Sequence, residues 1–150
     1  MSVDPRTLGW LSRALAHEMS AVQQYLAQSV LARLWGEHEL ASHLRREAVE
    51  EMGHAERLME RLILLGVPPS SGNLPPARLG RGVAELLAAD RALEVDAVRL
   101  YEDALAHARR MRDADSAALL ESILAEELAH VRELDGMLAA RQEAGQSRHG

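Results

Sequence analysis

The residues most able to do chemistry in this sequence are two copies of the pattern Glu-x-x-His. Glu51 and His54 form the first copy, and Glu127 and His130 form the second. Residues three apart in a helix lie on one face, so each copy offers a carboxylate and an imidazole to the same ligand. Oxygen and imidazole ligands suit divalent iron, manganese or zinc. Because the sequence has no cysteine, a thiolate metal site and a cysteine nucleophile are excluded.

The two copies belong to an internal repeat with an offset of 76 residues. At this offset Glu18 aligns with Glu94, both Glu-x-x-His copies align, and Tyr25 aligns with Tyr101. These are the only two tyrosines in the chain, so their alignment is not a chance effect of an Ala- and Leu-rich composition. The sequence therefore consists of two related halves.

The repeated polar residues predict a dinuclear metal site in the middle of a helical bundle. Buried carboxylates cost on the order of several kcal/mol each if nothing compensates them, and two divalent cations supply +4 against the −4 of four glutamates. One Glu from each of two helices, with Glu-x-x-His from the other two, is the ligand set of dinuclear carboxylate bundles. The expected ligands are Glu18 and His54 on one metal, Glu94 and His130 on the other, and Glu51 and Glu127 as bridges. A single Glu-x-x-His is common on solvated helix faces, but two copies with two partner glutamates are rare.

Composition and punctuation predict that four long helices carry these residues. Strong helix formers dominate, whereas aromatic residues make up 3% of the chain and Phe is absent, which argues against a β-sandwich or a doubly wound sheet. Asp4 and Pro5 form a helix-start signal, and Gly36 and Gly66 interrupt the apolar periodicity. The predicted helices cover about 5–35, 37–65, 83–112 and 115–142.

The segment between the second and third predicted helices is too long for a simple hairpin loop. Residues 67–81 contain four prolines and can span roughly 45 Å in polyproline geometry, which is about the length of a 30-residue helix. The segment can therefore return the chain to the end where the second helix began. The sequence predicts an all-α fold, a four-helix bundle of two antiparallel hairpins joined by a long crossover loop. We expect the bundle to occupy residues 1–144 and a flexible tail to occupy 145–150.

Charge and hydropathy exclude several classes of partner. The formal net charge is −6 with acidic residues spread along the chain, so no electrostatic footprint for nucleic acid exists. No apolar signal run begins the chain and no segment is apolar enough for a membrane span. We therefore expect a cytoplasmic protein without a membrane or nucleic-acid partner.

Other polar residues have less certain roles. Tyr25 lies two turns beyond Glu18 and joins the six ligands as a candidate catalytic residue, although a tyrosine hydroxyl that satisfies a buried carboxylate is an equally good reading. Asp90 is either a residue that orients a ligand histidine or a solvated aspartate. His38 and His43 are five residues apart and do not share a helical face, so they do not form a zincin motif.

At these positions the sequence is similar to the bacterioferritins of the ferritin superfamily, over about residues 1–140. The resemblance depends on the six ligands, Tyr25, Trp35 and the run Glu50-Glu51-Met52-Gly53-His54-Ala55-Glu56-Arg57. It implies a ferritin-like bundle with ferroxidase activity, which oxidises Fe(II) with oxygen or peroxide at a di-iron centre. It also implies iron storage as ferric mineral in a shell of 24 same-family subunits, and leaves open a ferredoxin-type reductant for iron release.

The resemblance further implies that Met52 binds haem b shared between two subunits. Helical spacing turns Met52 about 100° away from Glu51, toward the outside of the bundle. An apolar patch for dimer contact and haem is expected there, formed by Met19, Val22, Leu26, Val49 and Met52. The alternative is a methionine that fills an ordinary dimer interface.

The sequence departs from the family pattern at two places. Arg46 stands where many members have a histidine on the inner surface, which argues against an accessory interior iron site. The polar residues 141–150 predict that the family's fifth C-terminal helix is short or absent. Two alternative functions stay open: a rubrerythrin-like di-iron peroxidase without mineral storage, and a haem-binding structural subunit of a mixed ferritin cage.

Overall fold

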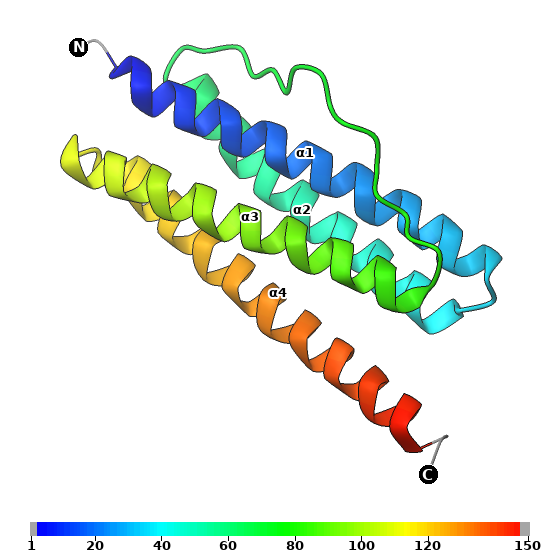
Figure 1. Cartoon of the computed structure of the whole chain (residues 1–150). Helices are drawn as coiled ribbons and strands as arrows, with labels where there is room; N and C mark the ends of the chain where they lie inside the picture. The colour runs from blue at the N-terminus through cyan, green and yellow to red at the C-terminus, as the bar shows by residue number, and fades with distance from the viewer. Residues whose placement is uncertain (1–2, 148–150) are drawn as a thin grey trace.

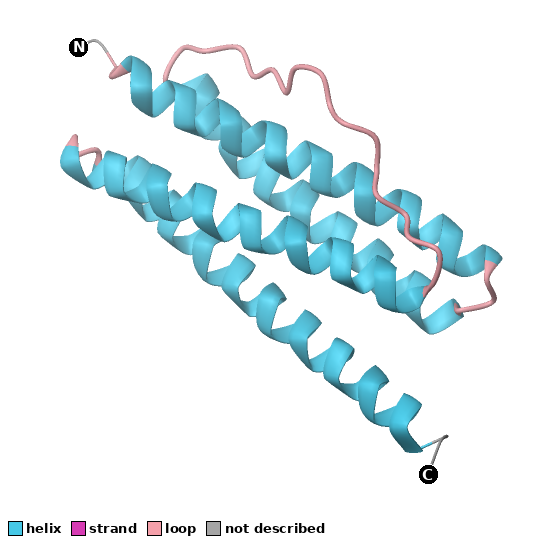
Figure 2. Cartoon of the chain, in the orientation of Figure 1, coloured by secondary structure: helices cyan, strands magenta, loops and turns pink. Residues whose placement is uncertain are grey.

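The computed structural model describes residues 3–147, which form four long α-helices (Figure 1). The helices are α1 (Pro5–Leu34), α2 (His38–Leu64), α3 (Val83–Arg110) and α4 (Ala114–Ser147). Residues 3–147 contain no β-strand (Figure 2). None of the helices in this range is long and apolar enough to cross a membrane. The predicted all-α, four-helix architecture is confirmed.

The helix ends follow the local chemistry of the sequence in two of three connections. Asp4 caps α1, because its Oδ2 accepts a hydrogen bond of 3.0 Å from the backbone N–H of Thr7. Gly36 and Gly66 end α1 and α2 with φ near +80°, a conformation that costs glycine little. The turn from α3 to α4 instead places Arg112 at φ 57°, without a glycine.

The two hairpins pack as the crossover prediction requires. α1 lies against α2, α3 lies against α4, and the segment 65–82 runs along α1 back to the end of the bundle where α2 began (Figure 1). The side chain of Gln28 on α1 holds this segment by donating a hydrogen bond of 2.8 Å to the carbonyl of Arg78. The crossover therefore makes the two hairpins antiparallel neighbours with their midpoints at the same height.

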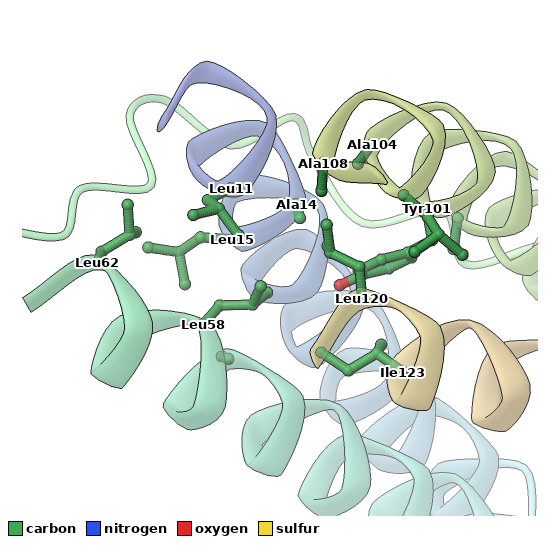
Figure 3. Close-up of a cluster of buried hydrophobic side chains, with 13 residues drawn as sticks. Leu11, Ala14, Leu15, Leu58, Leu62, Tyr101, Ala104, Ala108, Leu120 and Ile123 are labelled. Atoms are coloured by element: carbon green, nitrogen blue, oxygen red, sulfur yellow. The ribbon is translucent and has the colours of Figure 1, made fainter. Parts of the chain in front are cut away.

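The apolar core consists of two clusters, one on each side of the polar middle of the bundle. Figure 3 shows the first cluster, in which Leu15, Leu58, Tyr101 and Ile123 point toward one another from four different helices. The second cluster lies toward the other end and includes Ala32, Leu44, Leu86 and Leu134. Between the clusters on every helix stand the charged residues predicted to bind metal.

The last helix extends further than the sequence predicted. We expected α4 to end near Gln142 and residues 145–150 to form a flexible tail, but the helix continues to Ser147. A single glycine such as Gly145 is only about 1 kcal/mol less favourable than alanine inside a helix, so it does not have to end the helix. Residues 139–145 are exposed, and no separate fifth helix follows α4 within 3–147. The rest of the expected tail, 148–150, lies outside the described residues.

Candidate metal centre

The six predicted ligand side chains meet in the middle of the bundle. α1 and α3 each contribute one glutamate, and α2 and α4 each contribute a Glu-x-x-His pair. All six residues are at most 7% exposed. They are Glu18, Glu51, His54, Glu94, Glu127 and His130. The centre is therefore screened from bulk water by the two apolar clusters described above.

The six residues divide into two overlapping ligand groups. One group combines Glu18 and His54 with Glu51 and Glu127, and within it the ligand atoms lie within 4.8 Å of one another. The second group combines Glu94 and His130 with the same two glutamates at the same separation. Glu51 and Glu127 belong to both groups, as expected of carboxylates that bridge two metal ions.

Both histidines turn the same ring nitrogen toward the centre. His54 Nδ1 lies 2.9 Å from Glu127 Oε1 and 3.5 Å from Glu18 Oε2. His130 Nδ1 lies 3.1 Å from Glu51 Oε1 and 3.6 Å from Glu94 Oε2. Two Nδ1 atoms therefore face the carboxylates from opposite hairpins.

The outer nitrogens of the same rings contact carboxylates at the surface. His54 Nε2 is 2.8 Å from Glu126 Oε2, and His130 Nε2 is 2.7 Å from Glu50 Oε2. An outer carboxylate that accepts the Nε2 proton leaves Nδ1 with a lone pair for a metal and fixes the ring orientation. The sequence analysis did not assign this role to Glu50 and Glu126, although the two are also 76 residues apart.

The centre contains many buried polar atoms without a hydrogen-bond partner. They include both oxygens of Glu51, both oxygens of Glu127, and the Nδ1 atoms of the two histidines. Such atoms are rare in folded proteins because each carries a desolvation cost. Carboxylate oxygens from all four glutamates converge there with two imidazole nitrogens, and this set fits two divalent cations in charge and in ligand type.

Burial and close contacts shift the pKa values of the groups in this centre. Burial raises the pKa of Glu127 to about 11 and raises that of Glu18 well above its usual value. Burial alone would lower the pKa of His130, but its contacts with Glu51 and Glu94 raise it to about 12. Cation binding must therefore displace protons from this centre.

Two tyrosines each bind one of the outer glutamates. The hydroxyl of Tyr25 donates to Glu94 Oε1 at 2.6 Å, and that of Tyr101 donates to Glu18 Oε1 at 2.6 Å. Tyr25, which we expected among the catalytic residues, therefore contacts a ligand. This contact is the one expected of a hydroxyl that satisfies a buried carboxylate, and a catalytic role of Tyr25 stays a prediction.

Asp90 has neither of the two roles considered for it. It is fully buried, and its Oδ1 accepts a hydrogen bond of 2.9 Å from Gln24 on α1. Burial raises the pKa of Asp90 to about 7. Its side chain thus ties α3 to α1, and it is not solvated.

Met52 lies on a different surface from the metal ligands. It is 45% exposed, while the adjacent Glu51 is fully buried. Leu26 and Val49, two other members of the expected apolar patch, are 43% and 56% exposed. Met19 is half-buried and packs against the first core cluster. Three members of the expected patch, on α1 and α2, are therefore exposed apolar side chains.

Comparison with known proteins shows which family has this sequence and fold. Residues 9–142 match the ferritin-like domain of the ferritin family. A bacterioferritin from Mycobacterium bovis is 34% identical over 146 residues, which cover 97% of this chain and 92% of that protein. The chain belongs to the bacterioferritin family. A family member from Rhodobacter capsulatus is 33% identical over 145 residues, 97% of this chain and 90% of that protein.

A solved bacterioferritin structure has the same fold. The Rhodobacter capsulatus protein, determined at 2.6 Å, superimposes with a TM-score of 0.94 at 33% identity, covering 98% of this chain and 92% of that one. That structure is described as having a metal-free dinuclear site and a haem iron in a crystallographic special position. The predicted ferritin-like fold and the bacterioferritin resemblance are confirmed.

Proposed function

We propose that this chain is the subunit of an iron-storing ferroxidase, in which Fe(II) is oxidised at the dinuclear centre and kept as ferric mineral inside an oligomeric shell. The observation that carries the proposal is the convergence of buried carboxylate and Nδ1 atoms without hydrogen-bond partners. Membership of the bacterioferritin family supports the same function.

The six ligands have distinct tasks in this proposal. Glu18 and His54 would bind one Fe(II), Glu94 and His130 would bind the second, and the two remaining glutamates would bridge them. Two Fe(II) ions neutralise the four carboxylates. When bound, the two ions would supply two electrons, which with two protons would reduce dioxygen to hydrogen peroxide, or hydrogen peroxide to two water molecules. The carboxyl groups and imidazoles that release protons on cation binding are a nearby source of these protons.

An open groove between α2 and α4 gives the substrate a route to the centre. The groove has a volume of about 530 Å³ and reaches the outer edges of His54 and His130. Glu50 and Glu126, the partners of the two histidines, line it together with Glu133. Acidic groups at the mouth of a cleft attract cations, so this face is the expected entrance for Fe(II).

We propose that Met52 ligates haem b between two copies of the subunit. The fit of the residues present is good, because a soft thioether stands exposed among other exposed apolar side chains, including Leu26 and Val49. In the related Rhodobacter capsulatus structure the haem iron occupies a special position, which by definition lies on a symmetry element. Such a haem would supply electron-transfer chemistry, separate from the dinuclear centre.

The remaining parts of the proposal concern assembly and cellular context. The subunits would form dimers within a 24-subunit shell in the cytoplasm, and a ferredoxin-type reductant for iron release stays a prediction. A rubrerythrin-like peroxidase and a non-catalytic structural subunit are not favoured. The chain has the full set of six ligands, and its relatives are bacterioferritins.

Size-exclusion chromatography combined with an iron assay tests the proposed function. The purified protein is loaded with Fe(II) in air, and the elution volume, the retained iron and the rate of Fe(III) formation are measured. A large assembly that retains ferric iron is expected. Peroxide consumption without retained iron would instead indicate a rubrerythrin-like peroxidase, and a shell that does not oxidise Fe(II) would indicate a structural subunit.

A further inference from the structure

A second group of metal-ligating side chains lies one helical turn from the dinuclear centre. His43 and Glu47 are four residues apart on α2, so they share a face, and Glu133 approaches them from α4. Ligand atoms of the three residues lie within 4.8 Å of one another. None of the three is among the six ligands of the dinuclear centre.

Glu47 is the most unusual member of this group. It is only 6% exposed, and its Oε2 has no hydrogen-bond partner among the described residues. Its ion-pair contacts within residues 3–147 are the two histidines, His43 at 3.7 Å and His130 at 3.4 Å. A buried carboxylate without a strong partner is costly, and a cation beside it would remove that cost.

The separations in the group suit a shared cation better than direct hydrogen bonds. His43 Nε2 lies 3.7 Å from Glu47 Oε1, and His43 Nδ1 lies 3.7 Å from Glu133 Oε1. Both distances are too long for a hydrogen bond. Two ligands each about 2.1 Å from one ion can lie up to about 4.2 Å apart, so a cation fits between the imidazole and a carboxylate. The side chain of Glu133 is 49% exposed and can rotate onto the same ion.

A small cavity adjoins the group on its buried side. Its volume of about 10 Å³ has room for about one water molecule or ion. The polar residues that line it are Tyr25, His43, Glu47, Asp90, His130 and Glu133. The unpartnered carboxylate of Glu47 therefore borders a space of the right size.

We propose that His43, Glu47 and Glu133 form a third divalent-cation site beside the dinuclear centre. One imidazole and two carboxylates suit Fe(II), Mn(II) or Zn(II), and the two negative charges balance one such ion. Because Glu47 Oε2 lies 3.4 Å from His130 Nε2, the third ion would be a neighbour of the second ion of the dinuclear centre. The site requires no redox step, so it stands independently of the ferroxidase proposal.

Calorimetric titration of the metal-free assembled protein with Zn²⁺ tests the site. The variants His43→Ala and Glu133→Gln are expected to bind one Zn²⁺ fewer per subunit than the unaltered protein. His38→Ala is the matched control, because His38 is an exposed histidine at the start of the same helix, and it should keep the full number. Equal numbers in the unaltered protein and in His43→Ala would overturn the proposal.

The same titration separates this proposal from the dinuclear one. Zn²⁺ retained by His43→Ala reports the dinuclear centre, whereas the difference from the unaltered protein reports the third site. If the dinuclear centre failed to bind, the difference of one ion would remain. Crystals soaked in Zn²⁺ give a second readout, since an anomalous peak bounded by His43, Glu47 and Glu133 is expected. Peaks only at the dinuclear centre would contradict the third site.

Discussion

The hydroxyl of Tyr25 on α1 donates a hydrogen bond of 2.6 Å to Glu94 on α3. The 76-residue repeat generates its counterpart, in which Tyr101 on α3 donates to Glu18 on α1 at the same distance. In each pair the tyrosine occupies one oxygen of the glutamate and leaves Oε2 without a hydrogen-bond partner. The two tyrosines thus present the free oxygens of both terminal glutamates to the centre.

Replacement of either tyrosine by phenylalanine should impair the centre to a similar extent. Each change leaves a buried carboxylate oxygen unsatisfied, at a cost of about 1–3 kcal/mol, and frees the glutamate to turn. We expect Tyr25→Phe and Tyr101→Phe to weaken Zn²⁺ binding and to slow Fe(II) oxidation several-fold, both to a similar degree. Calorimetry and stopped-flow oxidation measure the two effects. If Tyr25→Phe alone lost rate with unchanged Zn²⁺ affinity, Tyr25 would act on the reaction itself and not through Glu94.

Loss of one terminal ligand should disable the dinuclear centre. We expect Glu94→Ala and His130→Ala to slow oxygen-dependent Fe(II) oxidation by at least about tenfold, since loss of interactions around a metal site has effects of this size. The fold of Glu94→Ala should persist, because removal of one buried carboxylate also removes its desolvation cost. Glu102→Ala, at an exposed position on the same helix as Glu94, is the control. Oxidation at the unaltered rate in both ligand variants would refute the assignment.

Met52→Leu should remove haem without affecting iron oxidation. The exposed thioether and the buried Glu51 lie on different surfaces, so the two cofactors would be independent. The expected result is loss of the haem Soret band with a nearly unchanged ferroxidase rate. Met111→Leu is a matched control, because Met111 is 48% exposed at the end of α3. A Soret band that survives Met52→Leu would identify another residue as the haem ligand.

Divalent cations should stabilise the metal-free protein. A ligand at 100 times its Kd adds about 2.7 kcal/mol to the free energy of unfolding, which corresponds to a rise in Tm of roughly 5–10 °C for a chain of this length. We expect such a rise with Mn²⁺ or Zn²⁺ in differential scanning calorimetry, and its reversal by a chelator. Glu51→Ala, which removes a carboxylate shared by both ligand groups, should lose most of the increase. An identical Tm with and without cations would argue against a buried site.

The cap of α1 should contribute a pH-dependent stability. The hydrogen bond with His107, 2.6 Å long, lowers the pKa of Asp4 below its usual 3.8. A carboxyl whose pKa is lower in the folded state stabilises the fold above the unfolded pKa and loses that effect as pH falls through the folded pKa. The urea midpoint of Asp4→Asn should therefore be lower than that of the unaltered protein at neutral pH, and the difference should shrink as the pH falls below 3.8 and through the lowered pKa of Asp4. A difference that persists in acid would assign the effect to the cap geometry alone.

The convergence of the six candidate ligands could be predicted from the sequence because helical geometry is regular; their binding of metal stays a prediction. Glu18 and Glu94 each lie within a few residues of the midpoint of a predicted helix, so antiparallel packing was expected to bring them to one height. The faces of α2 and α4 followed from the i, i+3 spacing of Glu-x-x-His. Helix boundaries and i, i+3 spacing are local patterns, so a single sequence is enough to predict which side chains meet inside the bundle.

Other features depended on contacts that no local pattern encodes. The turn at Arg112 has no glycine, and Gly145 continues a helix that its sequence seemed to end. Glu47 is buried against histidines from two helices, which the sequence analysis did not predict. Its environment is set by the packing of α2 against α4, which spacing along either helix does not reveal.

Because of the 76-residue repeat, the chain resembles two copies of one helical hairpin joined in tandem. A single ancestral hairpin with one Glu, one Glu-x-x-His and one Tyr could complete this centre only by meeting a second copy of itself. The crossover replaces that encounter by an intramolecular one, with an effective concentration on the order of millimolar for a short linker. The two halves are not identical in sequence: Met52 stands where the second half has Leu128, and both are exposed. One hairpin could thus acquire a thioether on its outer surface while the shared interior remained symmetric.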